Sequence, residues 1–198
     1  MLDTYYIYDI YGNLKYALSP MASAELTNRP NGVISSSDEA LQKYAFAYEY
    51  GYRNRCISKK LPGAASIYMV YDMCDQLIYT QDGNQRARSE WTYFVYDKLG
   101  RLAYSGTVID TRQHKILCYY YKNISLRTEF SPSNLMYGYT SVFSKAQKAD
   151  VKLVNYYDNY SFLDRYPTLK QELNYVANDG FDAKYVGPDP AQSEKGLL

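Results

Sequence analysis

The stretch Tyr8-Asp9-Ile10-Tyr11-Gly12-Asn13-Leu14 decides the fold, because its pattern returns three more times along the chain. The other copies are Tyr50-Gly51-Tyr52-Arg53-Asn54-Arg55-Cys56, Tyr71-Asp72-Met73-Cys74-Asp75-Gln76-Leu77 and Tyr96-Asp97-Lys98-Leu99-Gly100-Arg101-Leu102. Their first tyrosines are spaced by 42, 21 and 25 residues. A unit of about 21 residues with one longer interval indicates an internal structural repeat.

Each copy has the residue types of a tight turn. An Asp that follows the tyrosine can accept a hydrogen bond from the backbone two residues later. The fourth position holds Gly, Asn or Asp, which tolerate the left-handed backbone conformation. A type I turn followed by a left-handed residue joins two antiparallel strands through a β-bulge. We therefore predict one β-hairpin per copy, with structural turn residues Asp9, Gly12, Asn54, Asp72, Asp75, Asp97 and Gly100.

The turn spacing predicts a mainly β fold, in which an antiparallel β-hairpin meander forms a curved sheet with two or three short helices. The whole chain, 1–198, is expected to be a single module. Residues 5–108 form the repeat hairpins, and about six strands over 45–108 turn back at Pro62-Gly63 and Asp82-Gly83.

Other segments interrupt or follow the hairpins. A helical insert over 19–44 occupies the long interval, with helices expected over 20–26 and from a capping box at Ser36. Residues 110–158 form an irregular β segment, and residues 160–198 a helix followed by a loose tail. The expected strands are 116–121, 137–142 and 151–157, and the expected helix is 167–176.

Tyrosine dominates the composition, with 26 of 198 residues against 6 Phe and 1 Trp. Tyrosine rings at and two residues before each Tyr-Asp step are expected to line one sheet face, and the alternating positions are also mostly apolar, so both faces are expected to need cover. The formal net charge of +1 argues against a dedicated nucleic-acid binder. No apolar run approaches the ~18 residues of a membrane span, and the N-terminus resembles no signal peptide.

The chain carries no recognisable catalytic or metal-binding motif, and we predict that it is not an enzyme and needs no cofactor. Cys56, Cys74 and Cys118 have no CxxC spacing, and three unrelated thiols are the simplest interpretation. His114 stands in a polar stretch and is expected at the surface. Arg53, Arg55, Lys59 and Lys60 are expected to form a solvated strand face.

The motif Y-x-Y-D-x-x-G-[NR]-L, present as Tyr6-Ile7-Tyr8-Asp9 with Gly12-Asn13-Leu14 and again at 96–102, resembles the YD repeat of bacterial Rhs (rearrangement hotspot) proteins. The Lys60-Leu61-Pro62-Gly63 turn and the Tyr156–Tyr160 run add to the resemblance. It implies a β-sheet spiral that closes into a hollow shell around a variable, often toxic, C-terminal domain, in exported or cell-surface proteins. Teneurin ectodomains and the cocoons of insecticidal Tc toxins are similar.

The chain also departs from that family pattern. Gly51 replaces the Asp of the turn, and Asp75 replaces the Gly. The self-cleavage motif of the family is not matched around Pro188-Asp189-Pro190, so no protease residue is carried over. A chain of 198 residues holds too few repeats to close a shell, and we expect a fragment of one.

The resulting functional hypothesis is a structural or interaction module, a segment of a YD-repeat β-shell. We expect self-association through exposed edge strands near 5–16 or 101–108, and contact with neighbouring repeats or an enclosed toxin domain. The alternative is a carbohydrate-binding surface on which exposed Trp91 and Tyr93 stack against a glycan. Coplanar, solvent-exposed rings would favour that alternative.

Overall fold

The computed structural model describes residues 3–27, 35, 37–134, 136–142, 149–158 and 160–172. The chain divides into two compact units. The first comprises Met1–Tyr93 with Val108–Ser125, and the second Phe94–Thr107 with Leu126–Leu198. The fold is mainly β, as predicted, and the described residues include five short α-helices.

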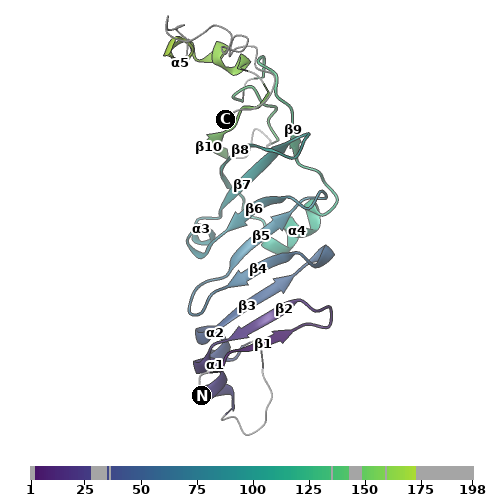
Figure 1. Cartoon of the computed structure of the whole chain (residues 1–198), viewed down its shortest axis with the longest axis vertical. Coiled ribbons are helices and arrows are strands. Elements are labelled where there is room, and N and C mark those ends of the chain that lie inside the picture. Colours follow the sequence, from purple (N-terminus) through teal and green to yellow (C-terminus); the bar gives the residue numbers. More distant parts are fainter. Residues whose placement is uncertain are drawn as a thin grey trace, which may run out of the picture. The chain divides into compact units, whose positions relative to one another are not determined.

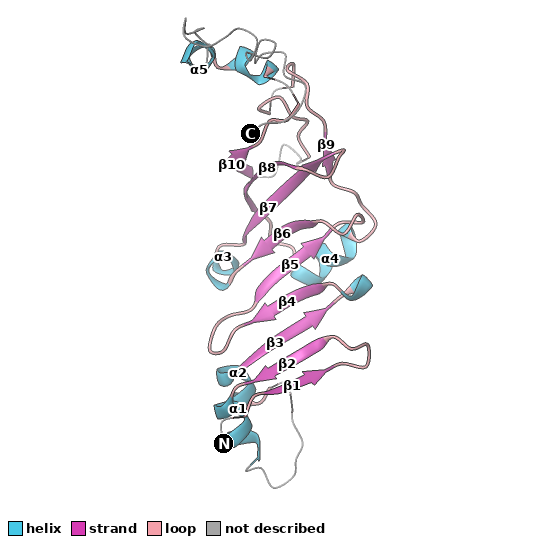
Figure 2. Cartoon of the chain, in the orientation of Figure 1, coloured by secondary structure: helices cyan, strands magenta, loops and turns pink. Residues whose placement is uncertain are grey.

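The strands follow one another in chain order through the sheet (Figures 1 and 2). Each strand pairs antiparallel with its neighbour over the first seven, so the predicted hairpin meander is confirmed. The seven strands are β1 (Tyr5–Tyr8), β2 (Leu14–Leu18), β3 (Ala45–Tyr50), β4 (Cys56–Lys60), β5 (Ile67–Tyr71), β6 (Leu77–Gln81) and β7 (Glu90–Asp97).

The repeat fixes the position of an irregularity in three of the hairpins. The register shifts directly before the repeat tyrosine, between Ile7 and Tyr8, between Glu49 and Tyr50, and between Val70 and Tyr71. Because a bulge adds one residue to one strand, it lets the left-handed turn residue close the hairpin without breaking the alternation further along.

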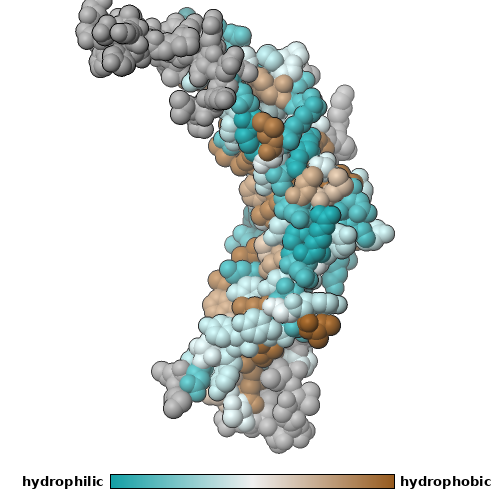
Figure 3. Space-filling view, turned by 45° about the vertical axis from the view of Figure 1, so that its right-hand side comes forward, coloured by the Kyte–Doolittle hydropathy of each residue, from teal (hydrophilic) through white to brown (hydrophobic). Residues whose placement is uncertain are grey.

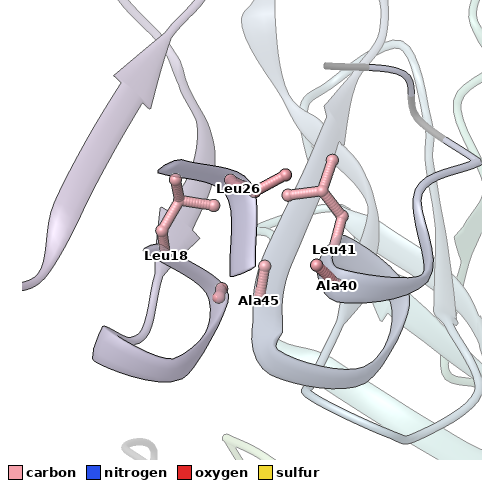
Figure 4. Close-up of a cluster of buried hydrophobic side chains, with 6 residues drawn as sticks. Leu18, Leu26, Ala40, Leu41 and Ala45 are labelled. Atoms are coloured by element: carbon pink, nitrogen blue, oxygen red, sulfur yellow. The ribbon is translucent and has the colours of Figure 1, made fainter. Parts of the chain in front are cut away.

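Two helices of the first unit fill the long interval between repeats. These are α1 (Pro20–Thr27) and α2 (Glu39–Tyr44). Leu26 and Leu41 pack with Leu18 of β2 and Ala45 of β3, and together with Ala22 and Ala40 they form a small aliphatic core (Figure 4). Ser36, the predicted capping residue, lies outside the described residues.

Two connections differ from the sequence prediction. The predicted turn at Asp82-Gly83 leads into α3 (Gly83–Ala87), because Asp82 and Gln85 form a reciprocal capping box.

The predicted strand over 116–121 is wrong, since this segment belongs to α4 (His114–Tyr121). Leu117 and Tyr121, four residues apart, are buried, whereas Tyr119 and Tyr120 between them are exposed. A short aromatic run suits a strand by composition, but burial every fourth residue is the period of a helix.

The second unit contains the end of β7, most of β8 (Leu102–Ile109), β9 (Arg127–Thr128) and β10 (Ala149–Val154). β9 pairs parallel with β7, and β8 lies between β7 and β10 in the strand order. The expectation that 101–108 is a free edge is therefore wrong. The 3-10 helix η2 (Ser161–Arg165) and α5 (Pro167–Glu172) follow.

The core of this second unit is aromatic. Tyr156 stacks on Phe162 with ring centroids 4.1 Å apart, and Tyr139 packs edge-on against Phe130 at 5.3 Å.

The predicted strand over 137–142 is wrong, because Tyr137 and Gly138 both adopt left-handed conformations and leave only isolated bridges around Tyr139. The strand predicted over 151–157 ends at Val154. The tail from residue 173 onward lies outside the described residues.

The predicted aromatic stripe does not form a uniformly covered face. On β1, Tyr5, Tyr6 and Tyr8 are all more than half exposed, whereas Ile7 is partly buried against the aliphatic core. On β7, burial alternates strictly, with Trp91 and Tyr93 inside. On the face drawn in Figure 3, apolar residues (brown) form separate small groups between pale and teal residues.

Candidate functional site: the Tyr-Asp turns and the pocket beside α4

The three Asp residues of the Tyr-Asp turns make the same pair of hydrogen bonds. In each, Oδ1 accepts from the backbone N–H groups two and four residues later, at 2.8–3.0 Å, at Asp9, Asp72 and Asp97. The Asn13 side chain also donates to Asp9 and is the largest cause that lowers the pKa of that carboxyl. The carboxylate thus satisfies backbone donors that the turn itself leaves without a strand partner.

The fourth turn position is left-handed in all four copies. The φ angles are 82° at Gly12, 54° at Asn54, 64° at Asp75 and 82° at Gly100. Asn and Asp adopt this conformation at low cost, which explains why the slot accepts them beside Gly. At the divergent copy that lacks the Asp, Arg53 is left-handed as well, with a φ of 61°.

Two tyrosines at Tyr-Asp or Tyr-Gly steps, Tyr50 and Tyr157, tie one hairpin to the hairpin before it. The Tyr50 hydroxyl donates to the backbone carbonyl of Leu14 at 3.0 Å, and the Tyr157 hydroxyl donates to that of Leu102 at 3.0 Å. Leu14 and Leu102 occupy the same repeat position, two residues after the turn glycine. Tyr71 instead places its hydroxyl 3.8 Å from Met69 Sδ. The second contact shows that Tyr157-Asp158 is used like a further copy of the motif, although its turn residues differ.

Arginine side chains bridge adjacent turns in both units. In the first unit, Arg53 and Arg55 each lie 2.9 Å from the Asp75 carboxylate, so the Asp that replaces Gly joins two hairpins. In the second unit, Arg101 contacts Asp97 at 2.7 Å and Asp158 at 2.6 Å. Hydrogen bonding from Arg101 lowers the pKa of the Asp158 carboxyl. Two members of the predicted solvated basic cluster are thus engaged in bridges between turns.

The rings proposed for sugar stacking are not accessible. Trp91 is 1% exposed and Tyr93 is 0% exposed. Trp91 packs edge-on against Tyr79, with centroids 6.1 Å apart, and its indole N–H donates to the carbonyl of Asp110. These two rings therefore offer no surface to a glycan, and they serve as the core beneath α4.

The structure brings His114 and Cys118 together, a pairing that was not predicted from the sequence. They lie four residues apart on α4, with Cys118 Sγ 3.3 Å from His114 Nε2. His114 is half-buried and not at the surface, and its ring stacks on Tyr68 at 4.4 Å. The i, i+4 spacing would have indicated the pair had this segment been predicted as a helix.

The Cys118–His114 pair does not have the chemistry of an activated thiolate. Burial raises the pKa of the Cys118 thiol to about 11 and lowers the pKa of His114, so both groups are neutral near pH 7. Nε2 also lies 3.0 Å from the backbone carbonyl oxygen of Met69, which requires that nitrogen to carry the proton. A protonated Nε2 cannot accept the proton of the thiol.

Beside α4, a cavity of about 540 Å³ opens in the first unit. Its lining includes Tyr68 of β5, Gln81 of β6, Arg86 of α3 and residues 110–115. Within the described part of the chain, no group of three or more His, Cys, Asp or Glu side chains could hold a metal ion. None of the helices in that part is long and apolar enough to cross a lipid bilayer.

No protein-family model and no curated protein matches this chain. The resemblance to YD-repeat proteins therefore rests on the Tyr-Asp motifs themselves.

Proposed function

We propose that the chain is a structural and interaction module, a segment of a YD-repeat-like β-scaffold without catalytic activity of its own. The observation that carries this proposal is the use of the repeated positions. The Asp closes its own turn, while the tyrosine of one motif bonds to the carbonyl that follows the turn of another. The repeat thus specifies how one hairpin attaches to the next, as expected of a unit that stacks.

The ionic contacts support the same proposal. Arg55 reaches the next turn twice, through the Asp75 carboxylate and through the carbonyl of Asp72 at 2.9 Å. Asp72 itself is fully buried. These contacts hold adjacent hairpins in register, because the arginine of one turn pairs with the carboxylate of the next.

The first strand of the sheet offers a surface for a partner. β1 pairs with β2 and with no other strand among the described residues. An edge strand presents unpaired backbone N–H and C=O groups that can pair with another strand. Tyr5, Tyr6 and Tyr8 add exposed aromatic area to this edge. We propose that a further hairpin, supplied by neighbouring repeats or by a second copy, adds to the sheet here.

The test is the oligomeric state of the full chain as a function of its concentration, measured by sedimentation velocity or light scattering. We expect reversible self-association that Tyr6→Lys weakens, because a charge on an edge strand opposes strand addition. Tyr11→Lys is the matched control: Tyr11 is exposed in the turn of the same hairpin, outside the strand. A strictly monomeric chain at high concentration would refute the pairing of a second copy at β1, and equal weakening by both variants would show that self-association does not use this strand.

A further inference from the structure

The cavity beside α4 has the dimensions of a ligand site. Its volume of about 540 Å³ falls within the roughly 300–1,000 Å³ range of small-molecule pockets. It lies wholly within the first unit, between β3, β5, β6, α3 and the segment 110–115. No aliphatic side chain lines it, so a purely apolar ligand would gain little there.

The charged side chains around the cavity comprise one ion pair and three groups that take part in no ion pair within the described part of the chain. Arg112 pairs with Asp110 through its Nε and Nη2 atoms, which neutralises both within the wall. Among the ion pairs of the described residues, Arg86 and Lys115 have no carboxylate partner, and Glu49 has no cationic one. The two cations and one carboxylate outside ion pairs leave the cavity with an excess of positive charge.

The guanidinium of Arg86, in the wall of the cavity, is fixed by its neighbours. It lies over the Tyr68 ring, 4.2 Å from the centroid, while His114 stacks on the same ring at 4.4 Å. Nη2 donates to the carbonyl of Ser66 at 2.7 Å. Nη1 is buried without any hydrogen-bond acceptor. A buried unpaired donor costs free energy. Because Nη1 has no exposed surface, Arg86 acts on an anion in the cavity through the charge of its guanidinium and not through a hydrogen bond from that atom. The stack fixes the group beforehand, which reduces the entropy lost on binding.

The remaining wall is rich in hydrogen-bonding groups. Gln81, Thr111 and Gln113 contribute amides and a hydroxyl, and Glu49 contributes a free acceptor. Ser89 at the same cavity has a left-handed backbone, with a φ of 51°, because it directly follows the C-cap residue of α3, where helices commonly end in this conformation.

We propose that this cavity binds a small polyhydroxylated anion, such as a sugar acid or a sugar phosphate, with Arg86 and Lys115 at the acid group. Glu49 and the amide side chains take the hydroxyl groups. The inference stands independently of the proposed scaffold function, because none of the Tyr-Asp turn contacts takes part in it.

The chain's single tryptophan provides the readout. Trp91 is buried, and its ring lies 6.3 Å from His114, a lining residue, so occupation of the cavity should alter its fluorescence. The full chain is titrated with four probes: glucuronate, glucose 6-phosphate, glucose and inorganic phosphate. We expect saturable binding of glucuronate or glucose 6-phosphate that weakens as salt is added, and which of the two binds identifies the acid group.

Variants locate the binding. Lys115→Gln should weaken it several-fold, and Arg86→Met about tenfold or more. Lys59→Gln is the matched control, since Lys59 is an exposed lysine of the same unit outside the lining of this cavity, and its replacement should leave binding unchanged. Should Arg86→Met fail to fold by circular dichroism, Lys115→Gln at an exposed position carries the comparison.

Four outcomes would overturn the proposal. They are the absence of saturable binding by any probe, equal binding of glucose and glucuronate, equal binding of inorganic phosphate and glucose 6-phosphate, and equal weakening by Lys59→Gln and Lys115→Gln.

Discussion

Replacing Asp72 with alanine tests whether the Asp of the repeat stabilises the fold through its turn. Asp72 is 0% exposed, and its Oδ1 accepts from the backbone N–H groups of Cys74 at 2.8 Å and Gln76 at 3.0 Å. Alanine removes the one oxygen that accepts both hydrogen bonds, and leaves the backbone N–H groups of Cys74 and Gln76 without it. Hydrogen bonds to a charged group contribute about 1.5–3 kcal/mol each, so we expect Asp72→Ala to lower the free energy of unfolding by about 3 kcal/mol.

The assay is equilibrium unfolding in urea followed by Trp91 fluorescence, because Trp91 belongs to the same unit as Asp72. With a slope of about 1–3 kcal/mol per molar urea, a loss of about 3 kcal/mol lowers the midpoint by about 1–3 M. Asp72→Asn keeps an acceptor that can close the same turn and loses only the charge, so it should recover most of the stability.

Asp9 supplies the internal comparison. Its Oδ1 makes the same two backbone contacts, at 2.9 Å each, but the residue is partly exposed, unlike the fully buried Asp72. Water can replace the lost acceptor there, so Asp9→Ala should shift the midpoint less than Asp72→Ala. A shift at Asp72 no larger than the shift at Asp9, or an Asp72→Asn variant as unstable as Asp72→Ala, would refute the argument.

Three further predictions follow from other contacts. Tyr50→Phe removes the hydroxyl that bonds to the preceding hairpin and should cost about 1 kcal/mol in urea unfolding, whereas Tyr8→Phe at an exposed ring should cost nothing; equal costs would show that the bond contributes nothing. Burial raises the pKa of Tyr139 from 10.0 to about 12, so its neutral form stabilises the second unit below pH 10 and this stability is lost as the pH rises through about 12. Tyrosinate absorbance and circular dichroism should then show loss of structure in that window, and ionisation of every tyrosine near pH 10 with the structure intact would contradict it. Finally, Cys74 is exposed whereas burial raises the pKa of Cys118 to about 11, so at neutral pH a thiol reagent should label Cys74 first and Cys118 slowly by peptide mass spectrometry; equal rates would exclude a buried Cys118.

The local part of the fold was predictable from sequence because its causes are local. A left-handed residue at the fourth turn position and an Asp at the first constrain the backbone whatever surrounds them, and Asp75 and Gly100 adopt the left-handed φ that their residue types allow. The segment 116–121 was not predictable in this way. Its short apolar run is compatible with either a strand or a helix, and the packing of this segment against the sheet decides between the two.

The candidate sites show the same division. The Tyr-Asp copies could be read directly, but the hydroxyl bond from Tyr50 to Leu14 spans 36 residues and depends on how hairpins stack. Trp91 and Tyr93 have the composition of a sugar platform and are instead buried. The exposure of a strand residue depends on what packs over the strand. The residues of β7 therefore do not reveal that α4, which begins about twenty residues later, covers them.

By itself, the sequence determined that this protein is a meander of tyrosine-marked hairpins, because turn conformations are set by the residues within each turn. The tertiary structure alone decided which tyrosines bond between hairpins, which become core, and that Arg86, His114 and Lys115 meet around one cavity. Those outcomes depend on contacts between segments far apart in the chain, where packing and exclusion of water, and no local preference, select the arrangement.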